Sequence, residues 1–417
     1  MTRFVDKCFL CGYFSTTVAP EQAGLSLASS GWSREVCTRN DVDEYRRFYY
    51  PEFVDFWLGD GGSCPVTTFS VVYAPQVPVD DVVAADAGCT ARLRGMRLCM
   101  MPLGMALYAV EVDLEGDDLN AFTLFLSRLR SRPEASEAVA AGLCQIRNSL
   151  GLDMSAGMME SGNKLKVFQI VRCLSADGVG AVAADATLFQ LGSLSRVAPY
   201  DPSDPAEISA AYLDSTIRDH KLSFYNNWSA LALFDTFTIL AGDVPDWMVG
   251  NWCDDYFGKI YMHSLFCKYF LYRQNMRFRA CPERGDQLEE ELNEFERRYC
   301  FNRISYNFMP GEIDKAIDRA LDIAQERRLL QASIRASNEE RSKASDRRLN
   351  SLLTLLTVLT VASTLWDFSS MVNALYPFGE GLGSETTGFR LVVSVTMLLI
   401  LVAVICIVLP RKVRRLS

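Results

Sequence analysis

The chain has 417 residues, of which 49% are hydrophobic and 22% are charged, and its formal net charge is −9. This length provides ample core for one or two folded domains. The acidic balance gives no indication of nucleic-acid binding, which typically requires a basic face.

Residues 1–245 are predicted to form an α+β domain with a substantial sheet. Runs rich in β-branched and aromatic residues predict strands at 66–74, 104–112, 166–172, 186–191 and 228–240. Helices are expected at 117–130, where acids begin and arginines end the segment as the helix dipole favours, and near 206–218, after a proline-rich loop.

Residues 246–309 are predicted to form a helical subdomain. Aromatic and aliphatic residues recur at helical spacing over 247–278, and a charged helix follows at 286–300. Pro310-Gly311 is expected to break the chain. From Glu312 to Val372 there is no proline or glycine, so one unbroken helix of roughly 90 Å is expected, with the segment 310–350 as its stalk.

Two apolar segments follow and predict a transmembrane hairpin. The first span is expected at 351–373 and the second at 390–410, joined by an outer loop at 374–389. Each span reaches the roughly 20 residues that a helix needs to cross a bilayer. The predicted fold class is therefore an α+β cytoplasmic domain, a long stalk helix and a C-terminal two-helix hairpin.

The charges that flank the hairpin predict its orientation. Arg347 and Arg348 precede the first span, and a basic tail at 411–417 follows the second. The loop between the spans carries Glu380 and Glu385 but no lysine or arginine. Because positive charge is enriched on the cytoplasmic side, we expect a multi-pass protein of the cell inner membrane with both termini in the cytoplasm.

The glycine-rich segments do not favour an enzyme. Residues 178–183 imitate a dinucleotide-binding turn, but the residues after them read as a strand rather than a helix. Residues 157–164 nearly match a phosphate-binding loop, but the lysine is displaced by one position and no serine or threonine follows it. With two histidines in the whole chain, general bases are few, and neither an enzyme nor a resident cofactor is predicted.

The cysteines and histidines also favour structural roles. Cys8 and Cys11 form a single CxxC pair without the second pair that a zinc site requires, so small buried thiols are the favoured interpretation. His263 and Cys267 lie four residues apart on a helix crowded with aromatic residues, which favours a packed core histidine.

A polar stripe follows the first span. Its members are Asn350, Leu353, Thr357, Thr360, Thr364 and Asp367. Their alternating spacing of three and four residues places all of them on one face of a helix. The stripe is interpreted as the lining of a water-filled pore, and the alternative is a packing seam in which threonines form hydrogen bonds between helices.

A second row, of acidic residues, is predicted on the stalk. Asp314, Asp318, Asp322 and Glu326 recur every four residues. One interpretation is a solvated face neutralised by basic neighbours. The other is a divalent-cation site between subunits, because hard cations prefer carboxylate oxygens.

The order of elements over 310–417 is similar to one known family. A long helix enters the membrane through Arg348-Leu349-Asn350 and continues with Leu356-Thr357-Val358, and a second span and a short basic tail follow. These features resemble the CorA-type divalent-cation transporters. The resemblance implies a homo-pentamer whose long helices form a funnel, whose first spanning helix lines the pore, and which takes Mg²⁺ or another divalent cation as substrate or regulator.

The resemblance also assigns positions in the pore. Asn350 would form an inner polar ring and Leu356 an apolar constriction. The Gly-Met-Asn signature of the family would fall at 374–376, where this chain has Ala-Leu-Tyr, and the nearest substitutes for the outer mouth are Met371 and Asn373. The departure concerns the part of the family's pore that selects hydrated Mg²⁺.

Two functions follow from the sequence. The first is a pentameric channel or transporter for divalent or other cations, with the lipid bilayer, copies of the chain and metal cations as partners. The alternative is a membrane effector whose cytoplasmic domain binds a small-molecule ligand, for example in nucleotide-signalling antiviral defence, and whose pore permeabilises the membrane.

Overall fold

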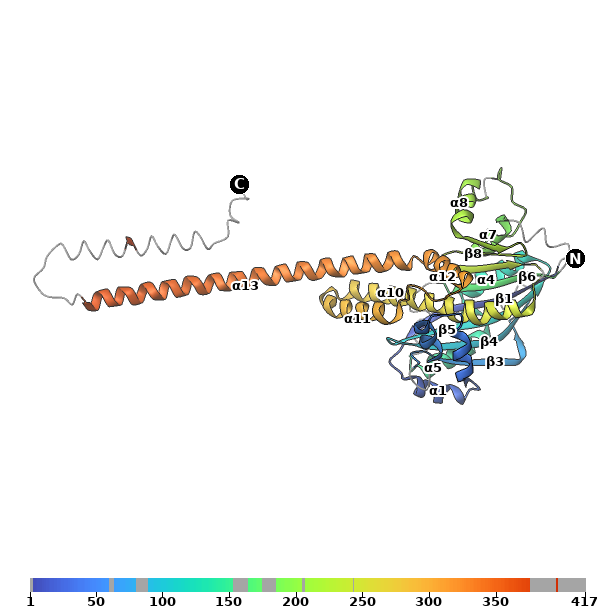
Figure 1. Ribbon diagram of the computed structural model, residues 1–417, viewed down its shortest axis with the longest axis horizontal. Helices are drawn as coiled ribbons and strands as arrows, with labels where there is room; N and C mark the ends of the chain where they lie inside the picture. Colours follow the sequence, from blue (N-terminus) through green and yellow to red (C-terminus); the bar gives the residue numbers. More distant parts are fainter. Residues whose placement is uncertain are drawn as a thin grey trace, which may run out of the picture. The chain divides into compact units, whose positions relative to one another are not determined.

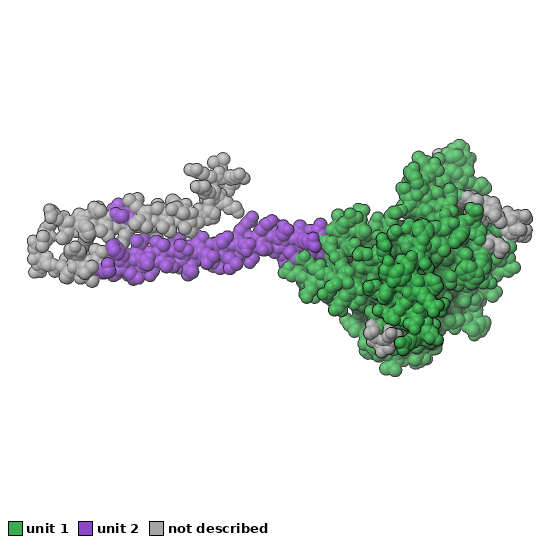
Figure 2. All heavy atoms as spheres, viewed as in Figure 1, with its two compact units in different colours: residues 1–331 green, residues 332–417 purple. Residues whose placement is uncertain are grey.

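A computed structural model of the chain describes residues 3–59, 64–79, 89–152, 164–174, 185–204, 207–242, 244–375 and 395–396. The chain divides into two compact units, residues 1–331 and residues 332–417 (Figure 2). The first unit is an α+β fold with a mixed sheet, and a long apolar helix reaches into the second unit, which confirms these parts of the predicted fold. The predicted second membrane span and basic tail lie outside the described residues, except for 395–396.

A sheet of nine strands forms the centre of the first unit (Figure 1). Its strands are β1 (Phe4–Ser15), β2 (Ser33–Arg34), β3 (Thr67–Pro78), β4 (Cys89–Met101), β5 (Met105–Gly116), β6 (Lys166–Cys173), β7 (Lys221–Tyr225), β8 (Trp228–Ala232) and β9 (Thr236–Ala241). They lie in the order β2-β3-β4-β5-β1-β6-β9-β8-β7. All neighbouring pairs are antiparallel except β6 and β9, which are parallel.

The helices follow the apolar segments of the sequence. They are α1 (Pro20–Ala28), α2 (Arg39–Tyr45), α3 (Pro51–Leu58), α4 (Leu119–Ser131), α5 (Glu137–Ser149), α7 (Asp185–Ser193), α8 (Ala210–His220), α9 (Asp246–Asn251), the π-helix η4 (Trp252–Tyr261), α10 (Met262–Ala280), α11 (Gly285–Tyr299), α12 (Phe308–Ala320) and α13 (Ile323–Leu375), with short 3₁₀ turns η2 (Pro133–Ala135) and η5 (Pro282–Arg284).

Both faces of the central strands are buried. On one face, Leu10 and other residues of β1 join a core with Phe122 of α4 and Leu143 of α5. On the other face, Phe9 stacks on Phe257 of η4, with ring centroids 3.8 Å apart. Strands covered on both sides lose the alternation of apolar and polar residues, which explains why β1 was not predicted.

Two predicted strands differ from the structure. Residues 186–191 belong to the helix α7, because Leu188 and Leu191 lie three residues apart and pack together on the sheet as a helix face. The predicted strand at 228–240 is the hairpin of β8 and β9, whose turn is closed by hydrogen bonds between the backbones of Leu233 and Thr236. The predictions at 66–74, 104–112 and 166–172 are confirmed by β3, β5 and β6.

The predicted unbroken helix from Glu312 to about Val372 is wrong at its start and in its continuity, whereas α13 does run past Val372 to Leu375. Pro310-Gly311 does not break the chain, because proline is tolerated in the first turn of α12, where its missing N–H has no partner to lose. The break falls instead between α12 and α13, where Asp322 adopts a left-handed conformation with a φ of 55°. Aspartate tolerates this conformation better than most residues because its side chain is short and polar.

The sequence also predicts Leu329, Leu330 and Ile334 as apolar anchors of the stalk that a single chain cannot bury, and this prediction needs correction. Leu329 is exposed, but Leu330 and Ile334 are buried within the single chain. Their burial therefore does not require neighbouring subunits, contrary to the prediction from the sequence.

Candidate functional site

The helix α13 contains a segment apolar enough to cross a membrane. Between Ile323 and Phe368 it includes an 18-residue apolar window, and no residue of this window is buried within the chain. An apolar helix surface that its own chain leaves uncovered calls for lipid or another subunit as its environment. The length and composition of α13 are therefore compatible with a membrane span.

The predicted pore residues all lie on this helix. Asn350, Leu353, Leu356, Thr357, Thr360, Thr364, Asp367 and Met371 are exposed members of α13. Asn373 belongs to α13 as well, but its side chain is outside the described part of the structure. Because the helix is continuous across these positions, the stripe stays on one face along its whole length.

The threonines of the stripe bind the backbone of their own helix. Thr357 donates a hydrogen bond to the carbonyl of Leu353, and Thr360 donates one to the carbonyl of Leu356, each at 2.8 Å. Thr364 does the same to Thr360 at 2.8 Å. These bonds satisfy each hydroxyl proton without water and leave oxygen lone pairs free to accept from a hydrated cation or a neighbouring helix.

The acidic residues predicted on the stalk do not form one row. Asp314 and Asp318 belong to α12, whereas Glu326 lies in the first turn of α13, beyond the left-handed Asp322. No group of three metal-binding side chains with a geometry suited to a metal ion occurs among the described residues. The cation site between subunits thus remains a prediction that involves at least two separate helices.

The basic neighbours of this row bind elsewhere. Lys315 pairs with Glu312 at 2.8 Å, and Arg319 donates a hydrogen bond to the carbonyl of Asp219 at 3.0 Å. The sequence interpretation in which Lys315 and Arg319 neutralise a solvated acidic face stays a prediction: their closest partners are other groups, but the charge of Lys315 acts against the rise in the pKa of Asp314. Burial, followed by the charge of Asp318, raises the pKa of Asp314 to about 7.

A chain of charged contacts connects the sheet with the beginning of α13. In the turn between β8 and β9, Asp235 accepts hydrogen bonds from Arg130 of α4 at 2.5 Å and from Lys166 of β6 at 2.7 Å. The ammonium of Lys166 also lies 3.6 Å from the ring centroid of Phe234, in the same turn. Arg130, Lys166 and Asp235 thus hold the turn to two neighbouring elements.

The same aromatic ring receives a second cation from the helical side. Lys268 of α10 lies 4.7 Å from the ring centroid of Phe234, and its ammonium is 2.9 Å from a carboxylate oxygen of Glu326. This last contact is a charge pair rather than an aligned hydrogen bond, because the same oxygen of Glu326 has no partner with hydrogen-bond geometry. We call the six residues Arg130, Lys166, Phe234, Asp235, Lys268 and Glu326 the junction network.

Electrostatics in the junction network favour the charged form of Asp235. Burial alone would raise the pKa of Asp235, but the hydrogen bond and charge of Lys166, together with the charge of Arg130, lower it. Burial lowers the pKa of Lys166, and the hydrogen bond from Lys166 to Asp235 opposes this shift. The buried cations are therefore stabilised by specific partners, as buried charges require.

The sequence did not reveal the junction network. Its one usable signal was charge inside apolar surroundings: Lys166 begins a buried strand, and Lys268 interrupts the aromatic helix 247–278. A lysine is seldom fully buried unless it is paired, so each position indicated a partner. The identity of the partner depends on the turn between β8 and β9, which the sequence analysis treated as one strand.

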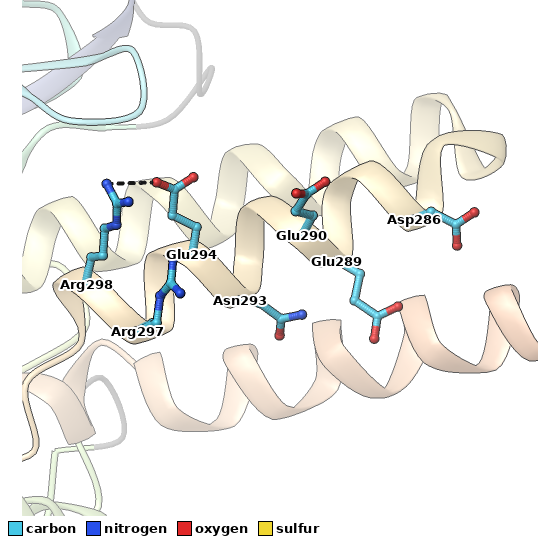
Figure 3. A pocket seen from close by; sticks show the side chains of 7 residues that line it. All are labelled: Asp286, Glu289, Glu290, Asn293, Glu294, Arg297 and Arg298. Carbon is cyan, nitrogen blue, oxygen red and sulfur yellow. Dashed lines mark ion pairs between the residues drawn. The ribbon is translucent and has the colours of Figure 1, made fainter.

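The groove along α11 is a weaker candidate for a site. It has a volume of about 610 Å³ and is open to solvent. It is lined by Asp286, Glu289, Glu290, Asn293, Glu294, Arg297 and Arg298 (Figure 3). The acids precede the arginines along the helix, as the helix dipole favours, and Glu294 pairs with Arg298 at 3.2 Å. These features describe an exposed charged helix face.

The histidine, the cysteines and the glycine-rich segments considered in the sequence show no sign of a functional site in the described part of the structure. His263 is buried, with its ring edge-to-face against Phe53 and Phe56, which confirms the packed histidine. Cys8 and Cys11 are buried free thiols of β1. The glycine-rich segment 178–183 and most of 157–164 lie outside the described residues.

Comparison of the chain with protein-family models, with curated proteins and with solved structures gives no match.

Proposed function

We propose that the protein is a CorA-like cation channel or transporter in which several copies of the chain arrange α13 around a common axis. The observation that carries this proposal is one helix with an uncovered apolar window and a continuous polar stripe on one face. A polar stripe within a membrane is stable only when it faces water or other helices. In a pore shared between copies, the polar face of α13 lies against water and the apolar face lies against lipid or a neighbouring helix.

In this arrangement, each kind of stripe residue has a separate role. Asn350 forms the inner polar ring, and Leu353 and Leu356 form the apolar constriction. Thr357, Thr360 and Thr364 then offer hydroxyl oxygens to a hydrated cation. Asp367, about 28 Å along the helix from Arg348, provides a ring of carboxylates near the outer mouth, which attracts cations and repels anions.

The threonines provide the test of the pore. Replacing Thr357 or Thr360 with valine keeps the side-chain shape and removes the hydroxyl oxygen. In liposomes containing the purified full-length protein, we expect each variant to lower the rate of cation flux several-fold without changing the oligomer. Ser351→Ala is the control, because it also removes a hydroxyl from α13 but lies about 100° around the helix from Asn350, outside the stripe. Equal flux in all of these proteins would contradict a pore lined by the stripe.

The alternative, a ligand-gated effector, is favoured by the departure from the family signature at 374–376 and by the junction network. Through its charged contacts, the network connects the sheet of the first unit with the beginning of α13. If liposomes with the wild-type protein show no flux but those with Lys268→Met do, the pore is closed by the domain and the effector is the better account. Flux in the wild-type protein alone favours the transporter.

A further inference from the structure

The face of α13 opposite the polar stripe carries a second regular row. Its members are Arg341, Ser345, Arg348, Leu352, Leu355, Leu359, Ala362 and Trp366. Their spacing alternates between four and three residues throughout, which keeps them on one face of a helix. Arg348 lies about 160° around the helix from Asn350, so this face is turned away from the stripe. We call this set the rear row.

The apolar part of the rear row has the length of a bilayer core. Arg348 and Trp366 are separated by about 27 Å along the helix, and the hydrocarbon core of a bilayer is about 30 Å thick. Leu352 and Leu355, which follow Arg348, are 62% and 57% exposed in the single chain. A tryptophan at one end of a span and a long basic side chain at the other are typical of the two interfaces between lipid and water. With α13 across a membrane, Arg348 therefore lies at the level of the phospholipid headgroups.

The charges that precede the apolar segment are divided between the faces of α13. Lys343 lies about 20° around the helix from Asn350, and Asp346 lies about 40° from it, so both are on the stripe side. Glu339, on the same side, pairs with Lys343 at 3.6 Å. The rear row has two arginines and a serine over these turns and no acidic residue. The positive charge of the stripe side is thus accompanied by carboxylates, whereas that of the rear row is not.

The arginines of the rear row are accessible to an external anion. Arg348 is exposed and Arg341 is partly exposed, and neither forms an ion pair with a described residue. Side chains of an α-helix lean towards its N-terminus, which carries the guanidinium of Arg348 away from the apolar segment and towards the exposed hydroxyl of Ser345. A guanidinium group binds phosphate oxygens through paired N–H donors, and a serine hydroxyl provides one more donor.

We propose that the rear row binds anionic phospholipids of the cytoplasmic leaflet. Arg348 and Ser345 bind the headgroup phosphate, and Leu352 and Leu355 contact the acyl chains. Arg341 lies about 10 Å farther along the helix, about one Debye length, and adds a weaker attraction. A zwitterionic headgroup carries an ammonium that repels guanidinium, so the site prefers headgroups with a net negative charge. This inference rests on the membrane span of the proposed function but not on the pore.

Native mass spectrometry of the full-length protein in detergent tests the lipid preference. The delipidated protein is titrated with phosphatidylglycerol or with phosphatidylcholine that has the same acyl chains, and the lipid molecules bound to each subunit are counted. We expect the wild-type protein to bind phosphatidylglycerol several-fold more tightly than phosphatidylcholine. Equal binding of the two lipids by the wild-type protein would overturn the proposal.

Single substitutions test the assignment to the rear row. Arg348→Gln should weaken the binding of phosphatidylglycerol about fivefold, the usual contribution of one basic residue next to anionic lipid. Arg341→Gln should weaken it by a smaller factor. Lys343→Gln is the matched control, because it removes the same charge from the stripe side of α13 and should change the binding little. Equal losses in Lys343→Gln and Arg348→Gln would contradict a site on the rear row.

Two further measurements separate this inference from the proposed function and lipid from soluble phosphate. If sodium carbonate extracts the protein from membranes, α13 is not a span, and the lipid site and the pore both fail. If the protein stays in the membrane and shows no preference for phosphatidylglycerol, only the lipid site fails. Glycerophosphoglycerol, the same headgroup without acyl chains, should not displace the lipid at an equal concentration. Displacement would assign the arginines to a soluble phosphate ester and overturn the lipid site.

Discussion

Lys268 and Glu326 form a charge pair of 2.9 Å that connects α10 with the first turn of α13. The side chain of Lys268 is only 8% exposed, and its other close partner is the ring of Phe234. The pair lies at the end of the junction network, so the sheet and the beginning of the long helix share one buried set of charges. A buried charge that loses its partner destabilises a protein more than a surface charge does.

Removal of one partner of the Lys268–Glu326 pair should cause a measurable loss of stability. Glu326→Gln should lower the free energy of unfolding by about 1–3 kcal/mol, because it leaves the buried ammonium of Lys268 without an anion. Glu294→Gln, which breaks the exposed pair with Arg298, should change it by less than about 1 kcal/mol. Urea denaturation of the full-length protein in detergent, followed by tryptophan fluorescence, measures both. Equal effects of the two substitutions would contradict a structural role for the junction pair.

The buried carboxyl group of Asp6 should make the free energy of unfolding depend on pH. This carboxyl of β1 is fully buried, and neither oxygen has an aligned hydrogen-bond partner among the described residues. Burial raises its pKa from 3.8 to about 7, although the Cys8 side chain and the backbone of Ile170 offset part of the shift. Between these two pKa values the folded chain keeps a proton that the unfolded chain has lost. The contribution of Asp6 to stability is therefore present at low pH and is lost as the pH rises towards 7.

The substitution Asp6→Asn tests this dependence, because asparagine stays neutral at every pH. Relative to this variant, the wild-type protein should lose about 1.4 kcal/mol of unfolding free energy per pH unit between roughly pH 4 and pH 7, and little more above. Urea denaturation at several pH values provides the comparison. A constant difference between the two proteins from pH 5 to pH 8 would show that Asp6 is not protonated in the folded chain.

The accuracy of the sequence predictions depends on how strongly each local pattern constrains the fold. Strands β3, β5 and β6 and the helix α4 were predicted because β-branched runs and oppositely charged ends are local signals. The helix α7 was read as a strand because its nine residues are short enough for apolar runs to suit either structure. The left-handed Asp322 was not predicted, because aspartate is found in helices, caps and turns alike and a single aspartate does not indicate which of these it adopts.

The candidate sites also could be predicted only where a local pattern in the sequence determines them. The stripe from Asn350 to Asp367 could be predicted because it lies on one continuous helix, where spacing determines the face. The junction network could not be predicted, because it depends on elements brought together by folding. A lysine inside an aromatic helix, such as Lys268, becomes informative only when its partner is known.

The acidic residues of α12 predict an effect of Mg²⁺. If Asp314 and Asp318 contribute to a cation site between subunits, Mg²⁺ should raise the thermal unfolding temperature of the oligomer, because a ligand that binds only the folded state stabilises it. The effect should be larger at pH 8 than at pH 6, since the pKa of Asp314 is raised to about 7. A thermal shift assay measures it, with Na⁺ at equal ionic strength as the control. No response of the wild-type protein to Mg²⁺ would remove the cation site.

The proposed pore requires an oligomer. We expect a homo-pentamer assembled through residues 312–372, because the apolar window and the polar stripe of α13 are both uncovered in the single chain. Native mass spectrometry from detergent measures the number of subunits. A stable monomer under conditions that preserve folding would exclude a shared pore, and another closed ring would correct the subunit number inferred from the family resemblance.

The most direct test of the pore is cation flux through Asp367→Asn. The substitution keeps the shape of the side chain and removes the charge, and Glu340→Gln removes an exposed charge from the same helix as a control. In liposomes, cation flux and the preference for cations over anions should fall in Asp367→Asn, with the oligomer intact and Glu340→Gln unchanged, because a ring of carboxylates attracts cations. Equal cation selectivity in the wild-type protein and Asp367→Asn would contradict a selective pore with Asp367 at its outer mouth.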